Sequence, residues 1–119
     1  MALTHVQPGK TMTYPNSSGA TIASGKPVLV GVRLGVASVD IADGESGELM
    51  MKEVHSLPKA SGAITQGAKL YWDADGSPVV GESASGCLTT TSTDNTLVGV
   101  AWAAAGETDA TVEIDLNSL

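Results

Sequence analysis

Apolar and polar residues alternate strictly in one stretch near the C-terminal end of the chain. From Thr111 onward, the apolar Val112, Ile114 and Leu116 share one parity, and polar residues take the other. Successive side chains of a strand point to opposite faces. The stretch at residues 111–116 therefore predicts a strand with one buried face.

Shorter stretches along the rest of the chain also favour strands. They are bounded by clusters of Gly, Pro, Asn, Asp and Ser, which end strands and form turns. A turn at Asp73–Gly76 predicts a hairpin, because Asp-Gly tolerates the positive φ of such turns. The expected strand segments are 11–14, 27–33, 35–41, 48–57, 68–73, 79–80 and 97–104.

Two of these strands are expected to meet near Gly35. Apolar residues occupy even positions from Val28 to Val36 and odd positions at Val39 and Ile41. A change of phase by one residue requires a bulge or a turn, and a glycine is the natural place for it.

Short strands at this spacing predict an all-β fold, a small single-domain β-barrel or β-sandwich. Residues 1–10 are polar, contain Pro8-Gly9 and lack a packed pattern. We therefore expect a flexible N-terminal arm over residues 1–10 and a single β-rich domain over residues 11–119. Leu34-Gly35-Val36-Ala37 and Val98-Gly99-Val100-Ala101 look alike, but four positions are too few to establish a repeat.

The composition predicts a thin hydrophobic core. The chain has 14 Gly, no Phe, two Trp and two Tyr, and large aromatic side chains normally supply much of the buried area. Self-association is expected to supply part of the burial that one chain lacks. Tyr71 and Trp72 are neighbours on an expected strand, so one can enter the core while the other faces a partner. Together with Trp102 they are the candidate subunit-interface residues.

The charge balance excludes some classes of partner. The net charge is −7, which argues against a nucleic-acid binder that tracks phosphates with clustered Lys and Arg. The longest nearly apolar run, residues 98–106, is too short to span a membrane. The first residues show no signal-peptide pattern, which fits synthesis in a cytoplasm. Four acids surround one turn, where a solvated loop is expected and a contact to a basic partner is the alternative: Asp40, Asp43, Glu45 and Glu48.

None of the catalytic or ligand-binding motifs that we tested is complete. Gly9-Lys10-Thr11 ends like a phosphate-binding loop, but Thr4 stands where the first Gly belongs. The Asp73–Asp75 segment starts like a calcium loop and then lacks the required Gly and Glu. Two His and one Cys do not form a zinc set, and Cys87 is expected to be a small buried residue. We expect no enzyme activity, no cofactor and no metal.

A series of packing and turn residues follows a fixed order from about residue 4 to residue 117. Its members are Gly25-x-Pro27-Val28, Leu34-Gly35-Val36-Ala37, Asp40-Ile41-Ala42-x-Gly44, Leu57-Pro58-Lys59, Gly67-Ala68-x-Leu70-Tyr71-Trp72-Asp73, Gly99-Val100-Ala101 and Asp109-x-Thr111-Val112. In order and spacing the series resembles the capsid cement, or head decoration, proteins of tailed phages. Some members carry a recombinase label, and the incomplete phosphate loop argues against that label for this chain.

The resemblance implies a structural virion protein that binds the exterior of the assembled phage head and stabilises it, as homotrimers at local three-fold positions. Its partners would be the major capsid protein of a tailed phage and further copies of itself, with no nucleic acid and no membrane. It would be synthesised in the host cytoplasm and act on the capsid exterior of the virion.

We expect the capsid contact in the N-terminal arm, because a short unpacked segment can order on binding by adding a strand to a sheet edge. A frayed terminus with no role is the alternative. The candidate contact residues are Leu3, Thr4, His5, Val6, Gln7 and Pro8.

Two other classes of function stay open. One is a non-catalytic β-sandwich binding module of another virion part, on the tail or for carbohydrate, which exposed Trp and Tyr faces would favour. The other is an enzyme or a nucleotide-dependent recombination factor, which a lack of ATP binding would exclude.

Overall fold

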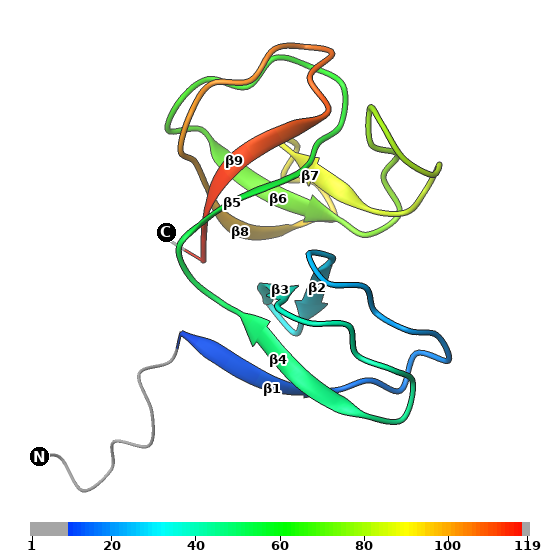
Figure 1. Ribbon diagram of the computed structural model, residues 1–119. Helices are drawn as coiled ribbons and strands as arrows, with labels where there is room; N and C mark the ends of the chain where they lie inside the picture. The colour runs from blue at the N-terminus through cyan, green and yellow to red at the C-terminus, as the bar shows by residue number, and fades with distance from the viewer. Residues whose placement is uncertain (1–9, 118–119) are drawn as a thin grey trace, which may run out of the picture. The chain divides into compact units, whose positions relative to one another are not determined.

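The computed structural model describes residues 10–117, and every regular element within that range is a strand (Figure 1). The all-β prediction is confirmed. Along this part of the chain the strands are β1 (Thr11–Pro15), β2 (Pro27–Val30), β3 (Arg33–Ala37), β4 (Ser46–Met50), β5 (Val54–Pro58), β6 (Lys69–Asp73), β7 (Cys87–Thr89), β8 (Thr96–Ala101) and β9 (Thr111–Leu116).

The strands belong to two compact units. The first unit contains the chain up to Val28 and the segment Gly35–Lys52, and the second contains Leu29–Leu34 and the chain from Glu53 onward. Each unit is described by itself below. A single domain over residues 11–119 stays a prediction.

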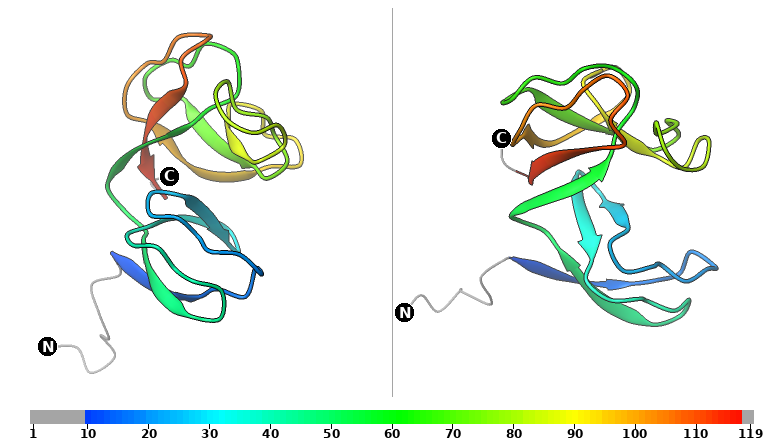
Figure 2. Two further views of the ribbon diagram at one scale, coloured as in Figure 1. Left: turned by 45° about the vertical axis from the view of Figure 1, so that its right-hand side comes forward. Right: turned by 45° about the horizontal axis from the view of Figure 1, so that its top comes forward.

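The first unit holds most of an antiparallel sheet with the strand order β1-β4-β3-β2, while the end of β2, the start of β3 and the turn between them belong to the second unit. β1 and β4 pair along their whole length, from Thr11 opposite Met50 to Pro15 opposite Ser46, and lie side by side in every view (Figures 1 and 2). Most of the buried side chains of this unit are medium-sized and aliphatic: Ile22, Val36, Ala37, Ile41, Leu49 and Met51.

The second unit is built on an antiparallel sheet with the order β5-β9-β8-β6-β7. β9 has the predicted bounds, and its Val112, Ile114 and Leu116 are buried while Thr111 and Glu113 are exposed. Strict alternation was therefore a sufficient signal for this strand. The other buried side chains of the unit are mostly aliphatic, with Trp72 as a large aromatic one: Leu34, Leu57, Ile64, Leu70, Trp72, Cys87, Leu88, Val98, Ala101 and Ala105.

Neither sheet of the described chain closes into a barrel. In the second unit, the edge strands β5 and β7 approach at one isolated parallel bridge between Lys59 and Leu88. There the Ala60 N–H donates to the Leu88 carbonyl over 2.9 Å. One bridge is not a continuous ladder, so the barrel alternative of the prediction is wrong. Two open antiparallel sheets fit the sandwich alternative.

The turn between β2 and β3 lies at Gly31 and Val32 and not near Gly35, where the phase change predicted it. Gly31 has a φ of 60°, and Val32 is 75% exposed. Gly35 lies inside β3, where an added side chain would meet Met51 and Leu49. A glycine in a strand can mark such a close approach instead of a bend.

The strand expected over residues 48–57 is in fact two strands in two different sheets. β4 ends at Met50 and β5 begins at Val54. Between them Glu53 has a φ of 78°, in the left-handed region that residues other than glycine rarely adopt. The mixed parity of this segment reflects the change of sheet, and not one strand covered on both faces.

The return of the hairpin after β6 also differs from the prediction. The turn at Asp73–Gly76 forms, with the Gly76 N–H donating to the Asp73 carbonyl over 3.2 Å. Residues 79–80 then stay in a loop, with Val80 65% exposed, and β7 pairs with β6 in their place. β7 is only three residues long and follows a polar loop, so its periodicity was too short to recognise.

Candidate functional site

The predicted capsid-contact residues lie outside the described part of the chain, so their role stays a prediction. They are Leu3, Thr4, His5, Val6, Gln7 and Pro8. The described chain begins beside the edge strand β1, where the Lys10 carbonyl accepts a hydrogen bond from the Met51 N–H over 2.8 Å.

The three aromatic candidates for a subunit interface differ in exposure. Trp72 is 7% exposed and belongs to the core of the second unit, Tyr71 is half-buried, and Trp102 is 56% exposed. The difference between Tyr71 and Trp72 is that expected of neighbours on a strand. Trp102 is therefore the aromatic side chain most available to a partner, although an interface role for any of the three stays a prediction.

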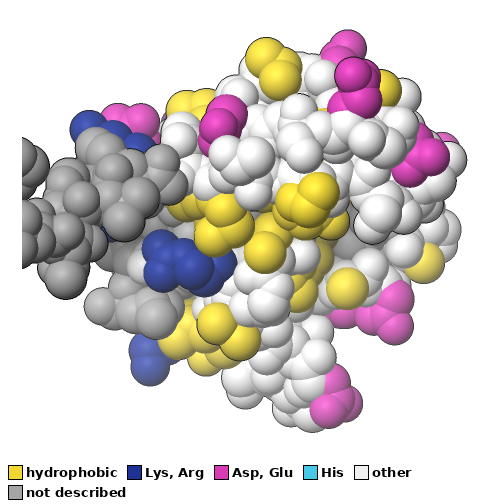
Figure 3. Space-filling view, turned by 90° about the horizontal axis from the view of Figure 1, so that it is seen from below, with side chains coloured by type: hydrophobic (Ala, Val, Ile, Leu, Met, Phe, Trp, Pro, Cys, Tyr) yellow, Lys and Arg dark blue, Asp and Glu magenta, His cyan; other side chains and the backbone are white. Residues whose placement is uncertain are grey.

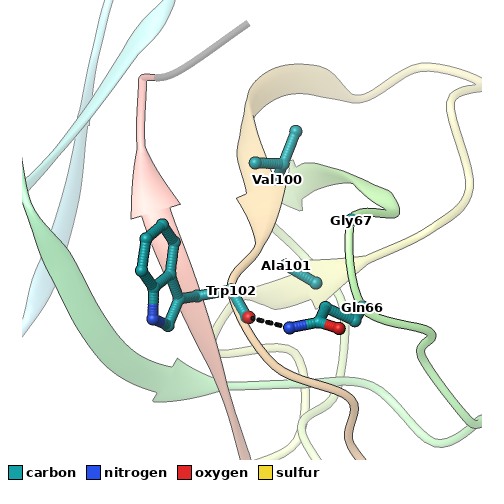
Figure 4. A pocket seen from close by; sticks show the side chains of 5 residues that line it. All are labelled: Gln66, Gly67, Val100, Ala101 and Trp102. Carbon is teal, nitrogen blue, oxygen red and sulfur yellow. Dashed lines mark hydrogen bonds between the residues drawn. The ribbon is translucent and has the colours of Figure 1, made fainter.

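Trp102 borders a shallow hollow on the second unit. The hollow has a volume of about 390 Å³ and is lined by Gln66, Gly67, Val100, Ala101 and Trp102 (Figure 4). We call it the Trp102 hollow. Figure 4 shows the indole turned away from the Gln66 side chain.

The backbone of Trp102 is held on both sides. β8 ends at Ala101, and the next N–H, that of Trp102, donates to the Glu113 carbonyl of β9 over 2.8 Å. The Gln66 side-chain amide donates to the Trp102 carbonyl over 3.2 Å. Both bonds involve only the backbone of Trp102, and its side chain is largely exposed.

The lining of the Trp102 hollow is uncharged and mostly apolar. Its five lining residues include no acid, base or nucleophile. The one polar side chain, Gln66, already donates to a backbone carbonyl. The hollow can therefore bind by apolar contact with another surface, and it offers no group for proton transfer or covalent chemistry.

The acidic turn at residues 40–48 is explained mainly by local loop structure. Three of its four carboxylates accept hydrogen bonds from neighbouring segments of the first unit. The pairs are Asp40 with the Ser24 N–H (2.7 Å), Asp43 with the Gly19 N–H (2.9 Å) and Glu48 with the Thr13 hydroxyl (2.9 Å). On the face shown in Figure 3, acidic side chains stand in separate small groups instead of one patch.

Cys87 is the small buried residue that the sequence predicted. It is 0% exposed, and burial, followed by the nearby Asp73 charge, raises the pKa of its thiol. The pKa of the Asp73 carboxyl is itself raised, chiefly by a hydrogen bond with the Asp75 side chain and then by burial. A thiol that keeps its proton is a poor nucleophile and a poor metal ligand.

Metal-site geometry is also missing from residues 10–117, where no group of three or more His, Cys, Asp or Glu side chains is placed to hold an ion. Over the same range, no helix has the length and the apolar character needed to cross a membrane.

Two buried polar side chains were not recognised from the sequence. Asn16 is 1% exposed, and its amide donates to the carbonyls of Ala20 and Ile41, each over 2.8 Å. Lys59 is 0% exposed, and its amino group donates to the carbonyls of Gly106 and Glu107 over 2.9 and 3.2 Å. Each side chain is buried beneath a loop and donates hydrogen bonds to carbonyls of that loop or of a neighbouring one. Such bonds produce no periodic pattern in the sequence.

One comparison with known proteins identified a relationship. A family model described as "Phage cement protein" matches residues 6–116, a range that includes both sheets and the Trp102 hollow. Searches of the curated proteins and of the solved structures found no significant match.

Proposed function

The chain belongs to the phage cement protein family, and from this premise we propose that it binds the exterior of an assembled phage head and stabilises the capsid there. The family is structural and non-catalytic, and its membership associates this chain with the capsid of a virion. The observation that carries the proposal is the family match over residues 6–116. The partner that we propose is the major capsid protein of a tailed phage.

A cement of this kind works by binding energy alone. A protein that binds the assembled lattice, and not its free subunits, shifts the equilibrium toward the lattice by mass action. Many copies acting together make modest single contacts strong. The absence of reactive groups from the lining of the Trp102 hollow agrees with such a role.

We propose that the protein acts as a homotrimer at local three-fold positions. The cores of both units are built mostly from aliphatic side chains, so burial between copies would add to a thin core. Size exclusion with light scattering tests the state in solution. A trimer would have a mass of about 36 kDa, three times the 12.0 kDa of one chain, and a monomer at every concentration would exclude preformed trimers.

Co-sedimentation with phage heads that lack decoration tests the function. We expect the protein to pellet with the heads to a saturable level and to raise the temperature at which the heads break open. The protein centrifuged without heads is the control. Protein that stays in the supernatant at saturating head concentrations would contradict the proposal.

We propose that the N-terminal arm makes the capsid contact. Deleting residues 2–9 removes the arm except Met1 and Lys10, and Lys10 is kept because its carbonyl accepts the Met51 N–H. The deletion should weaken head binding at least about tenfold, equivalent to about 1.4 kcal/mol, with the thermal unfolding midpoint unchanged.

A variant in which residues 2–9 are replaced by Gly and Ser at the same length is the matched control for the arm. It should bind heads nearly as weakly as the deletion does, because Gly is depleted in strands and the replaced segment lacks the side chains that would fill pockets beside an added strand. Full head binding by the folded deletion variant would contradict an arm contact.

A carbohydrate-binding module is the second candidate, and one observation bears on it. Trp102 is 56% exposed, and sugar-binding sites use such faces. A sugar site also needs polar side chains for the hydroxyls, and the Trp102 hollow offers only Gln66, whose amide already donates to the Trp102 carbonyl. The hollow therefore favours a protein surface over a sugar.

A further inference from the structure

The two sheets follow the same plan. The first has the order β1-β4-β3-β2, and the second has β5-β9-β8-β6 with β7 added at its edge. Matching them in chain order pairs β1 with β5, β2 with β6, β3 with β8 and β4 with β9. The one addition, β7, lies in the long connection between β6 and β8, where the first sheet has only the turn at Gly31 and Val32.

The hydrogen bonds outside the strand ladders match as well. The Gly25 N–H donates to the Ala37 carbonyl over 2.7 Å, and the Gly67 N–H donates to the Ala101 carbonyl over 2.8 Å. From the first pair to the second, the donor number rises by 42 (67 − 25) and the acceptor number by 64 (101 − 37). The Ile22–Ile41 and Ile64–Ala105 bridges differ by the same two numbers, 42 and 64.

Equivalent hydrogen bonds also join the residue before the first strand of each sheet to the end of the last strand. The Met51 N–H donates to the Lys10 carbonyl over 2.8 Å, and the Leu116 N–H donates to the Glu53 carbonyl over 3.1 Å. The same backbone frame therefore occurs twice, over residues 10–51 and over residues 53–116.

The buried polar side chains fall on equivalent positions of this frame. Asn16 follows the last residue of β1, and Lys59 follows the last residue of β5. The Asn16 N–H donates to the Glu45 carbonyl, and the Lys59 N–H donates to the Ala110 carbonyl. From this position both side chains donate to the loop that follows β3 in the first copy and β8 in the second, Asn16 to Ile41 and Lys59 to Gly106 and Glu107.

We infer that the chain is an internal duplication of one four-stranded frame, with a first copy at residues 10–51 and a second copy at residues 53–116. In the Trp102 hollow the second copy departs from the first on a shared backbone, and this hollow is the surface through which two chains of this protein associate. The second half of the inference rests on the proposed homotrimer and names the place where its subunits meet.

Position 102 shows the departure most clearly. Trp102 corresponds to Ser38, because the Ser38 N–H donates to the Glu48 carbonyl over 3.2 Å as the Trp102 N–H donates to that of Glu113. The side chain of Ser24 donates to the Ser38 carbonyl over 3.4 Å, as that of Gln66 does to the Trp102 carbonyl. The frame accepts a serine at this position, so the fold does not require an indole.

An exposed indole that the fold does not require is typical of an interface anchor. Trp is enriched among the residues that carry most of the binding energy of interfaces. Burying an indole removes a large apolar area from water. At 56% exposure, Trp102 leaves much of that area available to a partner.

The charge distribution of the molecule leaves the Trp102 hollow as a place where a second chain of this protein can bind. Each chain carries a net charge of −7, so two chains repel each other wherever their carboxylates meet. No charged residue occurs from Thr96 to Gly106, and none lines the Trp102 hollow. In the first copy, Asp40 follows Ser38 closely, whereas Ala104 takes the equivalent place after Trp102. Two chains of like charge can therefore approach each other at the Trp102 hollow with little repulsion.

The Trp102→Ser variant tests the inference, because the first copy carries serine at the equivalent position. Mass is measured by size exclusion with light scattering over a dilution series, and folding by thermal unfolding. We expect the wild-type protein to associate and the variant to need at least about tenfold higher concentration for the same mean mass, with its unfolding midpoint unchanged at low concentration. A variant of wild-type mass would overturn the proposal, as would a monomeric wild-type protein.

The Ser38→Trp variant is the matched control, with an indole on the equivalent backbone of the first copy. Combined with Trp102→Ser, it should not restore association, because the surroundings at Asp40 are charged. Restored association would show that any exposed indole suffices, and would overturn the assignment to the Trp102 hollow.

Acrylamide quenching of the wild-type protein gives a readout that needs no variant. Trp72 is buried and Trp102 exposed, so Trp102 should account for most of the quenching at low concentration. Association through the Trp102 hollow should lower the quenching constant as concentration rises, and an unchanged constant during association would overturn the proposal. Head binding, measured separately by co-sedimentation, decides the capsid function whatever the outcome at Trp102.

Discussion

Two side chains that the sequence would place on the surface are among the most buried in the protein. Lys is almost never fully buried unless its amino group is paired, and Lys59 meets this condition with the carbonyls of Gly106 and Glu107. Asn16 does the same with carbonyls of its own loop and with Ile41. Both form hydrogen bonds that a hydrophobic side chain of the same size could not form, and so each holds a loop in one conformation.

Replacing Lys59 with Met should lower the free energy of unfolding by about 1–3 kcal/mol, because two carbonyls lose a donor while the aliphatic packing is largely kept. Urea denaturation measures the change. The control is Lys69→Met on the exposed face of β6, which should change stability by no more than about 0.5 kcal/mol. Equal effects of the two substitutions would show that the bonds of Lys59 contribute nothing to stability.

At the scale of the element, glycines inside strands set how closely the strands and their neighbours approach. Gly35 in β3 and Gly99 in β8 occupy equivalent positions of the two copies. A side chain at position 35 would come within 2.7 Å of the Met51 Sδ. At position 99 it would collide with the backbone carbonyl oxygen of Asp115. The obstacles at position 35 are side-chain atoms, which include the Leu49 Cβ at 2.9 Å, whereas the obstacle at position 99 is backbone, which yields less.

Gly99→Ala should therefore destabilise the protein more than Gly35→Ala. For Gly35→Ala we expect a loss of about 1–3 kcal/mol, which is typical of overpacking. Both are compared by thermal unfolding with Gly106→Ala, where the nearest atom is an exposed Asp109 carboxylate oxygen at 3.3 Å. A larger effect at Gly35 than at Gly99 would contradict the backbone collision.

At the scale of the whole molecule, the net negative charge opposes the self-association that we propose at the uncharged Trp102 hollow. Net charge keeps proteins soluble and apart, and each chain here carries −7. The family places the protein at a capsid, where many copies are brought close together. The proposed self-association should therefore depend, at neutral pH, on how far the carboxylates are screened.

Raising the salt concentration from about 0.05 M to about 0.5 M should strengthen self-association of the wild-type protein, because the screening length falls from above about 10 Å to a few ångströms. Light scattering at fixed protein concentration measures the mean mass. Trp102→Ser should show a much smaller response. A mean mass that falls with salt would instead indicate that the copies are held by ion pairs.

The sequence by itself determined the all-β class, the bounds of β9, most strand positions and the family. A strand shows its two-residue period and its flanking turn residues at consecutive positions, so the local sequence is enough to predict it. It did not reveal the change of sheet at Glu53, the burial of Asn16 and Lys59, or the contrast between the buried Trp72 and the exposed Trp102. These depend on partners far away in the chain. The duplication was visible in the sequence only as two similar tetrapeptides. It is clear in the structure because each copy kept its backbone hydrogen bonds while most of its side chains changed.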